Sequence, residues 1–82
     1  MSYRYEEWRP QLFSEDGADT LLKTRDKVRG LLKVAGAFKE SLAWPSGDAW
    51  LSMAAIDYLV ERGEIECVWK NGTRQDRVYR SR

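Results

Sequence analysis

The chain has 82 residues and a mass of 9.6 kDa, which is enough for one domain and too little for a second hydrophobic core. Hydrophobic residues make up 43% and charged residues 33% of the sequence. This composition excludes an intrinsically disordered chain, and no apolar run approaches the roughly 18 residues that a membrane-spanning helix needs. We therefore expect a single folded domain over residues 1–82, without a membrane partner.

The residue types that most enzymes and metal sites use are scarce. The sequence has no histidine and one cysteine, Cys67, which excludes an internal disulfide, Cys/His zinc sites and His-based catalytic triads. Helix capping and cross-strand charge pairing explain the neighbouring carboxylates better than acid–base catalysis does. We expect no enzyme activity, no cofactor and no metal site. The polar N-terminus and the lone thiol indicate a cytoplasmic protein.

The charged residues are distributed unevenly, although the formal net charge is only +1. Residues 1–68 hold nine Lys and Arg against twelve Asp and Glu, a net charge of −3. Residues 69–82 hold five basic residues against one acidic residue, a net charge of +4. The C-terminal segment is therefore predicted to be a basic arm.

Residues 1–13 contain four large aromatic side chains and a proline. Pro10 disfavours a helix through the residue before it, so we expect this segment to be an extended aromatic arm. The arm is predicted to be a lid on the hydrophobic core, and an arm exchanged between two copies of the chain is the alternative. Its aromatic residues are Tyr3, Tyr5, Trp8 and Phe13.

The first predicted helix begins after Ser14, a good N-cap residue. It ends at Gly36, which suits the left-handed position that closes many helices. Apolar residues recur between these two points at the spacing of an amphipathic helix of about five turns. These residues are Leu21, Val28, Leu31, Leu32 and Ala35.

A short second helix is predicted over residues 37–43. Phe38 and Leu42 are four residues apart and would share one face of this helix. The sequence Trp44-Pro45-Ser46-Gly47 is then expected to break it.

The third predicted helix runs from about Ala49 to Arg62. Ser46 or Asp48 can cap its start, and Gly63 suits its end. Helical spacing divides its side chains into a buried stripe and an outward face. The predicted stripe is Ser52, Ala55, Ile56 and Leu59, and the predicted outward face is Trp50, Met53, Ala54, Asp57 and Glu61.

A β-hairpin over residues 64–80 is predicted after Gly63, where the spacing of the pattern changes from helical to alternating. Asn71-Gly72 is the strongest short signal for a two-residue turn. In the register that this turn sets, Ile65 faces Val78 on the inner side of the hairpin.

The same register predicts two further contacts. Glu66 faces Arg77 as an opposite-charge pair on the outer side of the hairpin. Cys67 points inward as a buried, inert thiol, but it then faces Asp76. A longer loop or a β-bulge is therefore the alternative to the two-residue turn.

Three helices followed by a hairpin, with the sequence of residues 50–65 across the third helix and its end, resemble the winged helix-turn-helix superfamily. The most specific part is the pattern Leu59-x-x-x-Gly63-x-Ile65, because superfamily members bury the leucine, turn on the glycine and insert the aliphatic residue beneath the wing. The resemblance covers about residues 14–80. It implies an α+β fold in which a three-helix core precedes a C-terminal β-hairpin wing. Residues 3–13 also resemble the start of small bacterial proteins of unassigned role, which implies no activity.

In DNA-binding members of this superfamily, the third helix enters the major groove and the wing contacts phosphates or the minor groove. Here the predicted outward face of the third helix carries two carboxylates and no base, which disfavours sequence-specific reading. The wing is basic and has Trp69 near its tip, so we expect a regulatory module that contacts double-stranded DNA through the wing. The predicted binding residues are Lys70, Asn71, Thr73, Arg74, Arg77 and Arg80.

Two alternatives to nucleic-acid binding stay open at this point. The wing could be a solvated hairpin, with Arg77 paired to Glu66 and Arg74 stacked on Trp69. The second alternative is association with another protein or with a second copy of the chain. An apolar spot on the third helix would then be the contact, unless the N-terminal arm covers it. The residues of this predicted interface are Trp50, Met53 and Trp44.

Overall fold

Four α-helices, two 3₁₀ helices and three strands make up the computed structural model, which describes residues 2–45 and 47–82. The first elements are α1 (Tyr5–Trp8), the 3₁₀ helix η1 (Arg9–Phe13), α2 (Glu15–Ala35), β1 (Ala37–Lys39) and α3 (Glu40–Ala43). They are followed by α4 (Ala49–Glu61), β2 (Ile65–Trp69), the 3₁₀ helix η2 (Arg74–Asp76) and β3 (Val78–Ser81). The fold is α+β, as predicted, with a helical core and a C-terminal hairpin.

Helix α2 has the predicted bounds. The Ser14 side chain accepts a hydrogen bond from the Gly17 backbone nitrogen at 3.2 Å, which caps the helix start. Gly36 closes the helix with a φ of 77°, a conformation that other residues rarely adopt. Val28 of the predicted stripe is buried, whereas Ala35 is exposed in the last turn.

Helix α4 also lies where it was predicted. Asp48 caps it by accepting hydrogen bonds from the backbone nitrogens of Trp50 at 2.8 Å and Leu51 at 3.3 Å. Ser46, the alternative cap, lies outside the described residues. Ala54 was predicted to face outward, and this is wrong because Ala54 is buried beneath the N-terminal segment with Leu12. The predicted buried stripe of Ser52, Ala55, Ile56 and Leu59 is confirmed.

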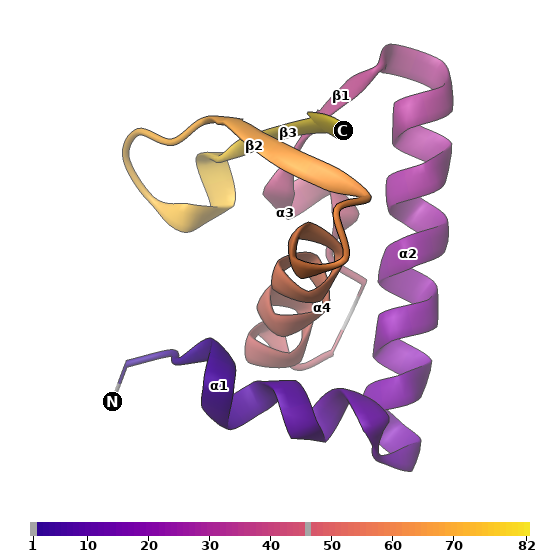
Figure 1. Ribbon diagram of the computed structural model, residues 1–82, viewed down its shortest axis with the longest axis vertical. Helices are drawn as coiled ribbons and strands as arrows, with labels where there is room; N and C mark the ends of the chain where they lie inside the picture. The colour runs from indigo at the N-terminus through magenta and orange to yellow at the C-terminus, as the bar shows by residue number, and fades with distance from the viewer. Residues whose placement is uncertain (1, 46) are drawn as a thin grey trace.

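The N-terminal segment is helical, not extended as predicted. Pro10 lies at the start of η1. Backbone N–H groups in the first turn of a helix have no acceptor within the helix, so proline, which lacks this group, fits there. In Figure 1 the segment lies across the lower ends of α2 and α4. Leu12 is fully buried there against Ala55. The prediction that this segment covers the core is therefore confirmed.

The three strands form one antiparallel sheet in the order β1-β3-β2 (Figure 1). Strand β1 replaces the predicted start of a helix at residues 37–39. Phe38 of β1 pairs with Tyr79 of β3, and their buried rings stack with centroids 5.6 Å apart. Leu42 is exposed, so the predicted shared face of Phe38 and Leu42 is wrong. Pairing with a distant strand outweighs the local helical pattern.

The hairpin register differs from the predicted one by three residues. Ile65 pairs with Ser81, and Glu66 pairs with Arg80, so the predicted partners Val78 and Arg77 are wrong. The register shifts between Cys67 and Trp69, and residues 70–77 form a longer loop that contains η2. The alternative of a longer loop with a bulge is thereby confirmed. Cys67 is exposed and not buried as predicted.

The main hydrophobic core lies between the sheet and the facing sides of α2 and α4. Leu59 and Ile65 are both 1% exposed on either side of the turn at Gly63, as the sequence pattern predicts. A second apolar cluster lies beneath the N-terminal segment. The buried residues of the main core are Val28, Phe38, Ala43, Ile56, Leu59, Ile65 and Tyr79.

Candidate nucleic-acid interface

The six wing residues predicted to bind nucleic acid do not form one surface. Lys70, Asn71 and Thr73 are exposed in the loop between β2 and η2. Arg77 is half-buried. Arg80 is exposed, but its Nε donates to Glu66 Oε1 at 2.7 Å, which neutralises part of the charge of this strand.

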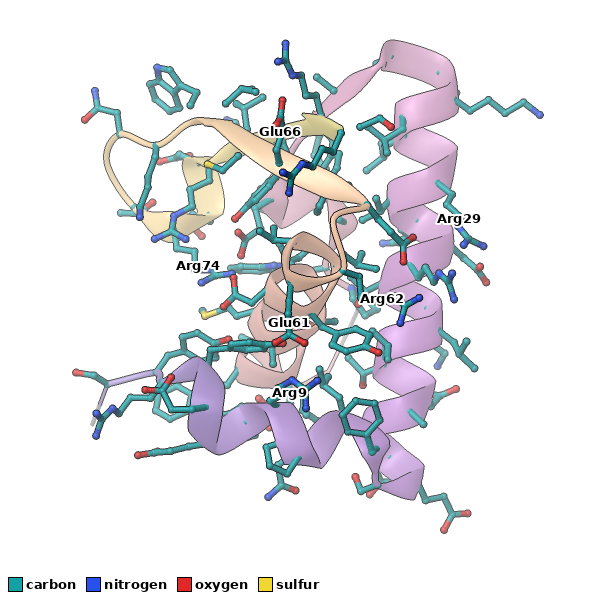
Figure 2. The ribbon with its side chains drawn as sticks, in the orientation of Figure 1. Arg9, Arg29, Glu61, Arg62, Glu66 and Arg74 are labelled. Carbon is teal, nitrogen blue, oxygen red and sulfur yellow. The ribbon has the colours of Figure 1, made fainter. Side chains whose placement is uncertain are left out.

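Arg74 points away from the wing and toward the helices (Figure 2). Its side chain is 17% exposed, with Nε donating to Glu40 Oε2 at 2.7 Å and Nη2 donating to Asp57 Oδ1 at 2.6 Å. The guanidinium lies over the Tyr3 ring, 5.2 Å from its centroid. The predicted stacking on Trp69 is therefore wrong, and the Arg74 guanidinium is engaged with the helices instead of lying on the exposed surface of the wing.

Glu40 and Asp57 are the anionic partners of Arg74. Glu40 has no exposed surface and also accepts hydrogen bonds from Tyr79 Oη at 2.6 Å and from Trp44 Nε1 at 3.2 Å. Asp57 Oδ2 accepts from Tyr3 Oη at 2.6 Å. Burial would lower the pKa of Arg74, but the hydrogen bonds to the two carboxylates outweigh it and raise that pKa. We call this set the Arg74 network: Tyr3, Glu40, Trp44, Asp57, Arg74 and Tyr79.

The outer face of α4 is covered by the chain itself. Trp50 makes edge-to-face contacts with Trp8 and Tyr3, with ring centroids 5.4 Å and 6.4 Å apart. The Met53 carbonyl accepts a hydrogen bond from Arg74 Nη2 at 3.2 Å. The structure therefore selects the alternative in which the N-terminal segment covers Trp50, and Trp44 is engaged with Glu40.

The last carboxylate on this face of α4, Glu61, is also engaged. Its Oε2 accepts from Arg9 Nη2 at 2.8 Å, and its Oε1 accepts from Tyr5 Oη at 3.1 Å (Figure 2). The hydrogen bond from Arg9 lowers the pKa of Glu61. With Asp57 bound to Arg74, both carboxylates of the predicted outward face hold other parts of the chain against α4.

Charge is separated between the two ends of the molecule. Residues 23–39, which form most of α2 together with β1, hold six basic residues against one acidic residue, and residues 62–82 hold six against three. Residues 1–22 hold two basic residues against five acidic ones. Figure 1 shows the sheet, the wing loop and the C-terminal part of α2 together at the end opposite α1 and η1. We call the end that holds the sheet, the wing loop and the C-terminal part of α2 the sheet end.

The contribution of α2 to this basic end was not predicted from the sequence. Arg25 and Arg29 lie four residues apart and both approach Glu64, at 3.6 Å and 3.8 Å. Residues with this spacing share one face of a helix, so their common position could have been read from the sequence. Their proximity to Glu64 could not, because it depends on how α2 packs beside the start of β2.

Among residues 2–45 and 47–82, no group of three or more His, Cys, Asp or Glu side chains could hold a metal ion. Within the same ranges, no helix combines the length and low polarity of a bilayer span. Comparisons of this chain with protein-family models, with curated proteins and with solved structures find no match. The functional interpretation therefore depends on the geometry and charge described above.

Proposed function

We propose that the chain is a winged-helix module that binds nucleic acid along its phosphates, using the sheet end. The order helix, strand, helix, helix, strand, strand and the β1-β3-β2 sheet support the winged-helix part of the proposal. Burial of Leu59 and Ile65 around the turn at Gly63 supports it as well, since the superfamily that the sequence resembles shares this arrangement.

The separation of charge carries the nucleic-acid part of the proposal. Double-stranded DNA holds about one negative charge per 1.7 Å of its axis, and neutralising phosphates releases condensed counterions. A molecule with a basic sheet end and an acidic opposite end is oriented by this field before contact. Lys70 and Arg77 belong to the wing loop between β2 and β3, which is part of the sheet end, whereas Arg4 directly precedes α1.

The covered face of α4 determines the kind of binding that we propose. Trp50, Asp57 and Glu61 are occupied by the N-terminal segment and by Arg74, so this helix face cannot present side chains to base edges. Contacts to phosphates position a protein without reading sequence. We therefore propose binding that tolerates different sequences and weakens strongly with salt.

Titration of labelled duplex DNA at about 50 mM and about 200 mM salt tests the proposal. We expect Lys70→Ala and Arg77→Ala each to weaken binding and to reduce the salt slope by roughly one for each phosphate that the variant no longer neutralises. Arg4→Ala is the matched control, because it removes one positive charge from an exposed site at the opposite end. It should leave binding unchanged.

Three outcomes contradict this proposal. One is the absence of binding at about 50 mM salt. The others are equal weakening by the control variant and a strong preference for one DNA sequence.

Protein association is the second candidate function, and the exposed Val68 and Trp69 on the edge strand β2 favour it. Self-association in sedimentation experiments, without DNA binding, would support that candidate.

A further inference from the structure

A cleft of about 350 Å³ opens between α2 and the segment that leads from α4 into β2. Its floor is apolar, and three arginines with one glutamate surround it. We call it the arginine cleft. Its apolar lining residues are Val28, Leu32, Leu59 and Ile65, and its charged lining residues are Arg25, Arg29, Glu64 and Arg82.

Among the described residues, Glu64 neutralises only part of the positive charge of the arginine cleft. Glu64 is the single carboxylate among the lining residues. Arg62, which is not part of the lining, also approaches Glu64, with 3.3 Å between Arg62 Nε and Glu64 Oε2. The Glu64 contacts of Arg25 and Arg29 are longer, at 3.6 Å and 3.8 Å, which exceeds a normal hydrogen bond. The lining therefore keeps an excess of cationic donors.

Arg25 shows how incomplete its contact with Glu64 is, because Glu64 Oε1 lies 3.6 Å from Arg25 Nε, too far for a hydrogen bond. This Nε atom is buried and has no hydrogen-bond partner among residues 2–45 and 47–82. Buried polar groups in folded proteins are nearly always hydrogen-bonded, so a donor left without an acceptor at the wall of a cleft marks a place for one. The guanidinium of Arg82 lies nearby, with Nη1 close to Gly63.

We propose that the arginine cleft binds a small organic phosphate, with the phosphate at Arg25 and Arg29 and a compact apolar body over the cleft floor. Guanidinium groups bind phosphate oxygens through paired, charge-assisted hydrogen bonds. Pockets for small ligands combine an apolar lining with a few polar groups and begin at about 300 Å³. This site is separate from Lys70 and Arg77 in the wing loop and goes beyond the proposed nucleic-acid binding.

Phenyl phosphate is a suitable probe, because it carries one phosphate on one apolar ring. Titration into the isotope-labelled full chain should give saturable NMR shifts at the amides of Leu59, Ile65 and Ser81, which line the cleft. Inorganic phosphate and benzyl alcohol each supply only half of the recognised chemistry. We expect both to bind at least about tenfold more weakly than phenyl phosphate.

Variants on α2 locate the site. Arg29→Gln should weaken phenyl phosphate binding at least about fivefold, and because this side chain is 58% exposed the substitution should leave the fold intact. Lys33→Gln is the matched control on the same helix, since it removes the same charge from an exposed residue outside the cleft lining. It should leave the affinity unchanged, as should the wing variant Lys70→Ala.

The proposal is overturned if the shifts do not saturate or are spread over the whole chain. It is also overturned if inorganic phosphate or benzyl alcohol binds as tightly as phenyl phosphate, or if the control on α2 weakens binding as much as Arg29→Gln. The DNA titration tests Lys70 and Arg77, whereas the phenyl phosphate titration tests Arg29. Failure of one proposal therefore does not decide the other.

Discussion

Arg74 joins several separate elements of the fold. It reaches from η2 to Glu40 of α3 and Asp57 of α4, and its guanidinium covers the ring of Tyr3. An ion pair of this kind contributes little relative to a well-packed apolar core, but removing one partner leaves the other charge buried and unpaired. Here two carboxylates would lose their only cationic hydrogen-bond donor among the described residues.

We predict that Arg74→Met lowers the free energy of unfolding by about 3–5 kcal/mol. The methionine keeps apolar volume but leaves Glu40 without a cation in a fully buried site. Urea unfolding followed by circular dichroism measures the decrease. Arg77→Met is the matched control in the same loop and should change stability far less. Equal stabilities of the two variants would show that the Arg74 network does not hold the wing to the helices.

The role of Arg74 could not be predicted from the sequence. Its hydrogen-bond partners Glu40 and Asp57 are 34 and 17 residues away, so no local spacing connects them. A basic segment with an Asn-Gly pair indicates a short, solvated wing. The exposure of Lys70 and Asn71 follows from that pattern, but the inward turn of one arginine does not.

At the scale of elements, the contact between η1 and α2 depends on the absence of a side chain. A Cβ atom on Gly17 would lie 1.7 Å from the carbonyl oxygen of Gln11 and 2.8 Å from the Cα atom of Leu12. These are backbone atoms, so no side-chain rotation can relieve the overlap. The N-terminal segment can therefore approach α2 this closely only at a glycine.

The two helical glycines of α2 should respond to alanine in opposite directions. Gly17→Ala should lower the free energy of unfolding by more than about 2 kcal/mol, because η1 must move away from the helix. Gly30 is exposed and has open space around it, so Gly30→Ala should raise stability by roughly 0.5–1 kcal/mol through helix propensity alone. Thermal unfolding of both variants tests this. A stabilising effect at both sites would contradict the close contact.

The two long helices could be predicted, but strand β1 and the hairpin register could not, for a physical reason. The start and stop signals of these helices act on backbone groups within a few residues of themselves, so they can be recognised in the sequence. These signals are Ser14, Gly36, Asp48 and Gly63. Strand β1 exists because it pairs with β3, about forty residues later, and its own sequence also suits a helix. The hairpin register likewise follows from the longer loop that holds Arg74, not from the local turn signal.

At the scale of the whole molecule, three tyrosines connect the N-terminal segment and the sheet to carboxylates on the helices. Tyr3 donates to Asp57, Tyr5 to Glu61 and Tyr79 to Glu40. Burial, followed by the hydrogen bond to the carboxylate, raises the pKa of each phenol. Together, burial and the hydrogen bond to Glu61 raise the pKa of Tyr5 to about 12.

These raised pKa values predict a loss of stability in alkali. Below the ordinary tyrosine pKa of 10.0, the phenols are neutral in both states and their stabilising contribution is complete. Above it the unfolded chain releases phenolic protons that the folded chain retains, so the free energy of unfolding falls as pH rises toward and through the folded-state pKa values. Urea unfolding at a series of pH values from neutral upward measures the decline.

Tyr79→Phe provides the control for this pH dependence. It removes one raised phenol, so the decline of stability above the ordinary tyrosine pKa should be less steep than in the wild type. The variant should also be less stable at neutral pH, because Glu40 loses a hydrogen-bond donor. A decline that is identical in both proteins would show that the buried phenol is not linked to folding.

The Arg74 network also has a consequence for synthesis of the chain. Its members come from residues 3, 40, 44, 57, 74 and 79, so a nascent polypeptide contains both carboxylates before it contains the arginine that neutralises them. In a growing chain that has not yet reached residue 74, Glu40 lacks its cationic partner, and Asp57 of α4 lacks its ion pair with Arg74. The domain is therefore expected to complete its folding only after almost its whole length has left the ribosome, in one late cooperative step.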